Sequence, residues 1–299
     1  MDQNTPGTPL SFRKTRLAPT PSGYLHLGNI FSFALTAALA EKYRAKILLR
    51  IDDLDRLRAQ PEYIHDIFDT LTFMEIPWQE GPRNVQEFEQ RWSQRHRLDR
   101  YGQALRQLRD QGMLYACDCS RTQILQADPS GTYPGRCRDR GLSLDTPDVN
   151  WRLRTTADSM LIVRTPDQPI TTTLPVDQHD FVVRKKDGFP AYQLTSLIDD
   201  VHFGVDFIVR GTDLWPSTLA QQYLAGVLGL ASFQRATFYH HALLTLAGRK
   251  LSKSAGDTSI QHLRKAGQTC QDIYQLIGEQ AGMKMPIKDW KTLMNAGRA

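Results

Sequence analysis

The amino-acid sequence predicts an α/β fold, in which a parallel sheet with flanking helices carries an inserted module and a short helical C-terminal region. The first observation is a strand, a glycine- and proline-rich loop, a helix and a second strand that follow one another over residues 14–51. The second is a stretch without periodicity, Met113–Thr146, which holds three of the four cysteines. The third is the helical pattern of Ser259–Asn295.

Composition and charge narrow the class of protein without specifying a function. Hydrophobic residues make up 40% and charged residues 23% of the 299 residues, as in ordinary globular proteins. No apolar run reaches the ~18–20 residues of a membrane span, and Met1–Phe12 lacks the apolar segment of a secretory signal. We therefore expect a cytoplasmic protein that binds no membrane. The net charge of +5 is compatible with polyanions such as ATP or RNA.

The first βαβ unit is expected from local patterns. Lys14–Ala18 is a short β-like run that stops at a Pro-Thr-Pro-Ser-Gly cluster, which favours a turn. Apolar residues then recur with a helical period from Asn29 to Arg44, where Asn29 or Ser32 could cap the first turn. Lys46–Ile51 is an apolar strand that completes the unit. Such a unit crosses over right-handedly, and ligands bind beyond the carboxyl ends of its strands.

The remaining elements follow in order along the chain. Helices are expected at Pro61–Met74 and Gln86–Gln111, antiparallel strands within Trp151–Val183, a helix at Phe189–Asp200, a strand at Phe207–Val209 and a helix at Asp213–Leu228. The second helix carries six arginines, which we interpret as a solvent-exposed face in preference to an RNA site: Arg91, Arg95, Arg97, Arg100, Arg106 and Arg109.

These patterns divide the chain into five parts. Residues 1–12 form a flexible lead, 13–112 a first α/β half, and 113–183 an inserted module. Residues 184–258 form a second half, and 259–299 a short helical C-terminal region.

The segment from Arg16 to Asn29 has the features of an anion-binding loop. Gly23 and Gly28 allow the backbone to approach a ligand closely. A helix begins directly afterwards, and its N-terminus offers unpaired N–H groups and a partial positive charge. His26 precedes the helix and could donate to a phosphate. Neither the dinucleotide fingerprint nor the P-loop pattern occurs here, so the loop alone does not identify the ligand.

A second candidate for phosphate binding lies far downstream, between Gly248 and Gly256. Flanking glycines predict a mobile loop, and Lys250 and Lys253 stand three positions apart within it. The two ammonium groups could close over a triphosphate and neutralise the charge that develops on leaving pyrophosphate. Taken alone, this segment is better interpreted as a solvated surface loop.

Together the two loops resemble the two signatures of class I aminoacyl-tRNA synthetases. His26-Leu-Gly-Asn29 resembles the HIGH motif, and Lys250-Leu-Ser-Lys-Ser254 resembles KMSKS with leucine in place of methionine. The resemblance implies that the two α/β halves form one Rossmann-like catalytic domain with a zinc-binding, acceptor-type module inserted between them. It also implies that His26, Gly28, Asn29, Lys250 and Lys253 bind ATP, with Mg²⁺ assisting, and that His26 and Lys253 contact the transition state.

Further motifs resemble the glutamyl branch of that family. They are Arg16-x-Ala-Pro-Thr-Pro-Ser-Gly-x-Leu-His26, Arg50-Ile-Asp-Asp-Leu-Asp55, Ala191-Tyr-Gln-Leu194 and Ile208-Val-Arg-Gly-Thr-Asp-Leu214. Only 45 residues follow Ser254, too few for the anticodon-binding region of a full glutamyl-tRNA synthetase. The chain is therefore similar to the truncated paralogues, the glutamyl-Q tRNA(Asp) synthetases. That family activates L-glutamate with ATP and attaches it to the queuosine base in the anticodon of tRNA(Asp).

The resemblance implies a set of glutamate-binding residues. Arg16 and Arg210 match the arginines that bind the substrate carboxylates, a task suited to the planar guanidinium fork. Tyr192 matches their hydroxyl partner, Thr20 a small hydroxyl residue, and Asp52 the acidic residue that meets the amino acid. The family pattern has glutamate in place of Asp52, so the carboxylate here is one methylene shorter. Without the resemblance, Tyr192 would be interpreted as a packing residue and Asp52 as a cap or surface charge.

The clustered cysteines favour a metal over a disulfide. Cys117, Cys119 and Cys137 fall within 21 positions of an otherwise cytosolic-looking chain, and three thiolates are suitable ligands for a structural Zn²⁺. Free thiols packed in a small core are the alternative. The resemblance adds Tyr133 as the fourth ligand. Cys270 stands apart on a predicted helix and is interpreted as a buried apolar residue.

The resemblance predicts a two-step reaction in a protein that we expect to be a monomer. The glutamate α-carboxylate attacks the α-phosphorus of ATP, and a queuosine hydroxyl then attacks the carbonyl of the glutamyl-adenylate. Three alternatives stay open. The chain could be a truncated glutamyl-tRNA synthetase that charges tRNA(Glu), or an inactive paralogue that only binds tRNA. It could also be another nucleotidyltransferase with a HIGH motif, whose substrate would not need Arg16, Tyr192 and Arg210.

Overall fold

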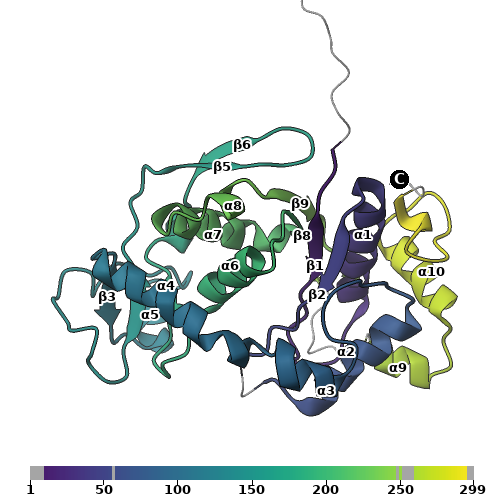
Figure 1. The fold of residues 1–299 in the computed structure, drawn as a ribbon, viewed down its shortest axis with the longest axis horizontal. Helices are drawn as coiled ribbons and strands as arrows, with labels where there is room; N and C mark the ends of the chain where they lie inside the picture. The colour runs from purple at the N-terminus through teal and green to yellow at the C-terminus, as the bar shows by residue number, and fades with distance from the viewer. Residues whose placement is uncertain (1–9, 56–57, 247–248, 251–258, 295–299) are drawn as a thin grey trace, which may run out of the picture.

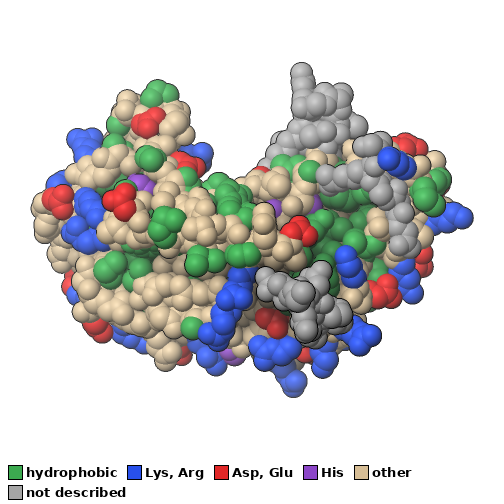
Figure 2. Space-filling view, turned by 90° about the horizontal axis from the view of Figure 1, so that it is seen from above, with side chains coloured by type: hydrophobic (Ala, Val, Ile, Leu, Met, Phe, Trp, Pro, Cys, Tyr) green, Lys and Arg blue, Asp and Glu red, His purple; other side chains and the backbone are tan. Residues whose placement is uncertain are grey.

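The computed structural model describes residues 10–55, 58–246, 249–250 and 259–294, with the backbone alone at 245–246 and 249–250. Figure 1 shows the central strands between α1 (Leu27–Tyr43) on one side and α6 (Tyr192–His202) and α7 (Trp215–Val227) on the other. Lys253 and most of the lead at 1–12 lie outside the described residues. Basic and acidic side chains are interspersed over the face in Figure 2, so the excess positive charge does not form a single patch there.

The central strands form two parallel pairs. β1 (Lys14–Leu17) pairs with β2 (Lys46–Leu49), and β8 (Phe207–Gly211) pairs with β9 (Thr237–His241). The Asp206 N–H donates to the Lys14 carbonyl over 3.1 Å, and the Asp206 carboxylate accepts from the Lys14 N–H over 2.9 Å. The two pairs therefore lie side by side, and the predicted βαβ unit and parallel α/β fold are confirmed.

Each central strand places its side chains alternately in two hydrophobic cores. Leu49, Phe207 and Val209 pack with α1 and the C-terminal helices, whereas Leu48 and Ile208 pack with the helices of the opposite side. This alternation follows from the period of two along a strand. It also explains why β2 and β8 each carry three consecutive apolar residues, since both faces are covered.

Phe12, from the predicted lead, stacks on Phe207 with ring centroids 4.4 Å apart.

The helices of the two layers match most of the predicted ranges. The helices are α1 (Leu27–Tyr43), α2 (Pro61–Phe73), α6 (Tyr192–His202), α7 (Trp215–Val227), α8 (Ala231–Gln234), α9 (Ile260–Lys265) and α10 (Cys270–Gln280), with short 3-10 turns at η3 (Val176–Gln178), η4 (Thr212–Leu214) and η6 (Thr292–Met294). None of the helices in these described ranges has both the length and the apolar character that crossing a bilayer requires.

The single helix predicted at Gln86–Gln111 is wrong. The structure has α3 (Val85–Glu87), a π-turn η1 (Phe88–Trp92), a 3-10 turn η2 (Gln94–Arg97) and α4 (Leu98–Asp110). The chain leaves the helical conformation at Ser93, where ψ is 140°. The Asp53 carboxylate accepts bonds from the Ser93 hydroxyl and from the Gln94 N–H, the latter over 2.8 Å. A buried acceptor 40 residues upstream thus competes with the helix for these donors.

Arg97 corrects the prediction of a uniformly exposed arginine face. The other five arginines of that stretch are exposed, but Arg97 is 5% exposed and forms a two-bond ion pair with Asp199 over 2.7 and 3.0 Å. Asp199 also accepts from the Tyr101 hydroxyl over 2.7 Å and from the Gln94 amide over 2.9 Å. Burial alone would raise the pKa of Asp199, but these donors hold it below its ordinary value.

The inserted region is built from short antiparallel strands. Its three-stranded sheet has the order β3 (Leu114–Cys117), β4 (Asn150–Leu153), β7 (Val182–Arg184), and a separate hairpin joins β5 (Met160–Val163) to β6 (Ile170–Thr173). Within Met113–Thr146, only β3 and α5 (Arg121–Ala127) are regular, as the lack of periodicity predicts. Two further strands of two residues each, β10 (Thr245–Leu246) and β11 (Arg249–Lys250), pair in an antiparallel orientation.

We expect Asp199→Ala to lower the free energy of unfolding by about 3–5 kcal/mol, because it leaves the buried Arg97 guanidinium without its charge partner. Urea denaturation at neutral pH measures the effect. Asp110→Ala, an exposed aspartate at the end of α4, is the matched control and should stay within about 0.5 kcal/mol of wild type. A small loss in both variants would contradict this account of the network.

Candidate functional site

The loop after β1 ends in a cap on α1. The helix begins at Leu27 and His26 is its N-cap, so the prediction of Ser32 as a cap is wrong, whereas Asn29 contributes its side chain to the capping box at position N3. The Gly28 N–H donates to His26 Nδ1 over 3.1 Å, and the His26 N–H donates to the Asn29 side-chain oxygen over 3.1 Å. A neutral imidazole that accepts at Nδ1 carries its proton on Nε2. This arrangement orients the His26 ring at the positive end of the helix.

A cavity of about 360 Å³ joins the two halves at this point. Its lining includes His26, Gly28 and Asn29 from the first half and Gly211 and Asp213 from the second. The structure therefore brings together three of the predicted ATP-binding residues at the carboxyl ends of the central strands. The segment that follows the second predicted loop lies nearby, because the Ile260 N–H donates to the Leu25 carbonyl over 2.8 Å. Of the remaining candidates, Lys253 is not described and Lys250 is described by its backbone alone.

An array of buried charges lies beside a second cavity. Asp200, from α6, accepts on one oxygen from Arg16 over 3.2 Å and from Arg50 over 2.7 Å. Arg50 also holds Asp52 with two bonds of 2.8 and 2.9 Å. The second Arg16 bond goes to the Val209 carbonyl over 3.1 Å. One carboxylate thus joins β1 to the end of β2, and the predicted residues Arg16 and Asp52 belong to one hydrogen-bonded chain.

The second cavity, of about 350 Å³, has Thr20, Asp52 and Tyr192 in its lining. Tyr192 is the first residue of α6 and its surface is 42% exposed, which excludes the interpretation of it as a core residue. Burial raises the pKa of Asp52 to about 6 despite the opposing charge of Arg50, so the carboxylate is ionised at neutral pH.

Arg210 is the one arginine of this group without a carboxylate partner among the described residues. It is 3% exposed, and its Nη1 donates to Gln221 over 3.0 Å. Its Nε and Nη2 atoms are buried and have no hydrogen-bond partner in the part of the chain that the structure describes. Burial lowers its pKa to about 10, while the hydroxyl of Tyr192 opposes the shift. These two unsatisfied guanidinium donors can bind an anionic group.

The predicted metal ligands meet in a separate cluster. The sulfurs of Cys117, Cys119 and Cys137 all lie within 4.8 Å of one another, and Cys119 Sγ is 3.5 Å from Cys137 Sγ. Tetrahedral thiolate ligands of zinc lie ~3.8 Å apart, given Zn–S bonds of ~2.3 Å. All three thiols are buried and unbridged. The interpretation of Cys270 as buried needs correction, because it is only partly buried at the start of α10.

Tyr133 lies against the same sulfurs. Its hydroxyl accepts from the Cys137 N–H over 2.8 Å. Burial would raise the pKa of Cys117, but hydrogen bonds from Tyr133 and the nearby charge of Arg152 lower it below its ordinary value. The Arg152 guanidinium stacks 3.5 Å from the Tyr133 ring centroid. The four side chains can therefore surround a metal ion.

Sequence reasoning missed the residues that position the site. The sequence predicts no role for Arg50, although this residue lies in one of the family motifs. It predicts Asp200 only as the last residue of a helix. A signal was present, because Asp199-Asp200 is a pair of carboxylates in an otherwise apolar helical pattern. Such a pair indicates buried partners, although it does not say which.

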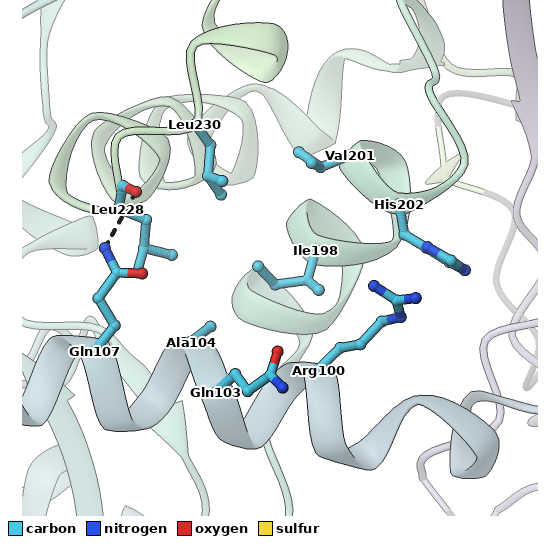
Figure 3. A pocket seen from close by; sticks show the side chains of 9 residues that line it. All are labelled: Arg100, Gln103, Ala104, Gln107, Ile198, Val201, His202, Leu228 and Leu230. Carbon is cyan, nitrogen blue, oxygen red and sulfur yellow. Dashed lines mark hydrogen bonds between the residues drawn. The ribbon is translucent and has the colours of Figure 1, made fainter.

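A further cavity of about 210 Å³ lies between α4 and α6, away from all predicted residues. Figure 3 shows Arg100 and His202 on the same side of it, and the Gln107 amide donating to the Leu228 carbonyl. Its other lining residues are mostly apolar. The reaction predicted from the sequence gives this cavity no role.

Comparisons with known proteins place the chain among tRNA synthetases. Residues 13–289 match the family described as "tRNA synthetases class I (E and Q), catalytic domain". A relative from Nocardia farcinica, named glutamyl-Q tRNA(Asp) synthetase, is 37% identical over 90% of this chain and 84% of its own length. A relative of the same name from Pseudomonas fluorescens is 38% identical over 80% of this chain and 75% of its own.

Longer relatives share the same region. Glutamate–tRNA ligase 2 of Nitrosococcus oceani is 33% identical over 85% of this chain, which spans 56% of that protein. The crystal structure of a glutamate–tRNA synthetase from Elizabethkingia anophelis superposes with a TM-score of 0.75 at 20% identity. That match covers 96% of this chain and 66% of the other, and it confirms the fold.

The cysteine cluster predicts that the purified protein carries about one equivalent of a thiolate-preferring metal. Elemental analysis after gel filtration measures the content. Cys119→Ser and Cys137→Ser should lose most of the metal, whereas Cys270→Ser should retain it because Cys270 lies outside the cluster. Equal metal content in all three variants would exclude the cluster as the binding site.

Proposed function

The chain belongs to the class I tRNA synthetases of the glutamate and glutamine group, and we propose that it activates L-glutamate with ATP and transfers it to queuosine in the anticodon of tRNA(Asp). The names of several relatives support this choice of substrate and acceptor. The observation that carries the proposal is Arg210, a buried cation with two donors that have no partner among the described residues, in the neighbourhood of the Tyr192 side chain that lines the second cavity.

The charges around the amino-acid cavity fit one substrate carboxylate. Among the five residues Arg16, Arg50, Arg210, Asp52 and Asp200, three are buried cations and two are buried anions, so this group carries one positive charge in excess. Arg210 binds a carboxylate of glutamate with its two open donors. Asp52 and Tyr192 face the amino group, and Arg50 holds the shorter Asp52 side chain in a fixed orientation. An amide side chain would leave the Arg210 charge uncompensated, which favours glutamate over glutamine.

Activation is an in-line displacement at phosphorus. An oxygen of the glutamate α-carboxylate bonds to the α-phosphorus of ATP, and the bond from that phosphorus to the bridging oxygen breaks, so pyrophosphate leaves with the electron pair. His26 donates from Nε2 to the phosphates at the start of α1, and Lys253 neutralises the leaving group. Gly28, Asn29 and Lys250 complete the ATP site. Mg²⁺ bound with ATP supplies further charge neutralisation.

In the second step, a hydroxyl oxygen of the queuosine cyclopentenediol attacks the adenylate carbonyl. The ester bond forms as AMP leaves, and the hydroxyl proton passes to solvent or to the AMP phosphate. No protein nucleophile is required, so catalysis rests on positioning and charge. A tRNA substrate places this activity in the cytoplasm, and the protein acts as a monomer.

The cysteine cluster is a structural zinc site in this proposal. Cys117, Cys119, Cys137 and Tyr133 would hold the ion, which orders the loop-rich segment around them. The five parts of the chain keep the boundaries given above, with the zinc module inserted between the two catalytic halves.

We expect labelled glutamate to transfer to tRNA(Asp) that contains queuosine and not to the same tRNA without it. Site mapping after mild alkaline treatment locates the label. Lys253→Ala should slow glutamate-dependent ATP–pyrophosphate exchange by about a hundredfold or more, because it removes a charge on the leaving group. Lys265→Ala, an exposed lysine of α9, is the control and should leave exchange unchanged.

Two results would overturn the proposal. Glutamate on the 3′ end of tRNA(Glu) would identify a truncated glutamyl-tRNA synthetase. Absence of exchange, together with salt-sensitive tRNA binding, would identify an inactive paralogue.

A further inference from the structure

Asp66 is a buried carboxylate outside the predicted site that contacts the backbone of the first signature motif. It lies on α2 and is 4% exposed. One of its oxygens accepts from the Leu25 N–H over 3.1 Å, and the other accepts from the Thr70 hydroxyl over 3.3 Å. Leu25 directly precedes His26, so α2 fixes the peptide between Tyr24 and Leu25, one residue before the cap.

The next peptide, between Leu25 and His26, is held by the start of α9. The Leu25 carbonyl accepts from the Ile260 N–H over 2.8 Å, and His26 forms an antiparallel bridge with Ser259. Figure 1 shows α2 and α9 side by side below α1. Leu25 therefore connects a side chain of α2 to the backbone at the start of α9, and the approach to His26 is fixed on both sides.

Among the described residues, Asp66 is the hydrogen-bond acceptor of the Leu25 N–H. Residues 18–25 lie outside the helices and strands, and a buried N–H without an acceptor costs about 1–3 kcal/mol. A charged acceptor gives a stronger bond than a neutral one. The carboxylate sits at the wall of a groove between α2 and α9, where burial raises its pKa while the Leu25 N–H, Thr70 and Arg264 oppose that shift.

We propose that Asp66 is a positioning residue for His26. By holding the Leu25 peptide, it sets the backbone angle at which the His26 ring caps α1 and presents Nε2 to the ATP cavity. The inference rests on the proposed function in one respect, the contact between His26 and ATP. Asp66 itself touches neither substrate nor the reacting atoms.

The test compares variants that keep or remove the acceptor. Asp66→Asn keeps a side-chain oxygen that can accept from Leu25, and Asp66→Leu removes it at similar volume. Asp69→Asn neutralises an exposed aspartate three residues further along α2 and is the matched control. Should leucine prevent folding, Asp66→Ala is the second disrupting variant. Circular dichroism and urea denaturation establish that each variant is folded.

Steady-state ATP–pyrophosphate exchange gives the kinetic result. We expect Asp66→Leu to lower kcat by about 10–100-fold, because a displaced catalytic contact has costs of this order. The KM for glutamate should stay within about threefold, since the amino-acid cavity is formed by other elements. Asp66→Asn should recover most of the rate. A proportional fall in activity and folded fraction, with no rescue by asparagine, would overturn the proposal.

A second measurement is independent of activity. Long-range ¹H–¹⁵N spectra assign the His26 tautomer, with His26→Gln identifying the signals. Wild type and the two asparagine variants should show the Nε2–H form, whereas Asp66→Leu should shift toward a mixture because the Gly28 N–H bond is weakened. An unchanged His26 signal in Asp66→Leu would contradict positioning. If wild type lacks exchange, the proposed function fails, and these spectra still decide the role of Asp66.

Discussion

The Asp200 carboxylate is the interaction on which the site depends. It is fully buried and binds Arg16 from β1 and Arg50 from the end of β2 with one oxygen. Buried cations are costly unless they are paired, so these two arginines can occupy the space between the halves only because α6 brings Asp200 there. Arg50 then orients Asp52, which lines the second cavity together with Thr20 from the first half and Tyr192 from the second.

Because Asp200 compensates Arg16 and Arg50, Arg210 is the one arginine of this group without a carboxylate partner among the described residues. Arg16 is largely satisfied by Asp200 and the Val209 carbonyl, whereas Arg210 has only Gln221 among the described residues. The fold thus holds a guanidinium ready for a ligand without reorganisation, which lowers the cost of binding. His26 is fixed in a comparable way at the neighbouring cavity, through its capping bonds and through Leu25 and Asp66.

Local patterns predicted the elements, and long-range partners decided the exceptions. The strands, α1, α2 and α7 follow from apolar periodicity, which each segment carries by itself. The break at Ser93 and the burial of Arg97 depend on Asp53 and Asp199, which are 40 and 102 residues away along the chain. The cysteine cluster was readable from spacing, because thiols so close in sequence are easily brought together. Tyr133 entered only through the resemblance, since a tyrosine carries no comparable signal, and the role of Asp200 was not foreseen because its partners lie on other strands.

The most direct test of the excess positive charge is to measure how the Arg210→Gln substitution changes the selectivity for glutamate over glutamine. Glutamate- and glutamine-dependent ATP–pyrophosphate exchange is measured for wild type and for Arg210→Gln, with the KM for ATP determined in parallel. The account predicts that the substitution lowers kcat/KM for glutamate by about a hundredfold or more, with the KM for ATP nearly unchanged and the preference over glutamine lost. Retention of both the glutamate KM and the preference in Arg210→Gln would contradict it.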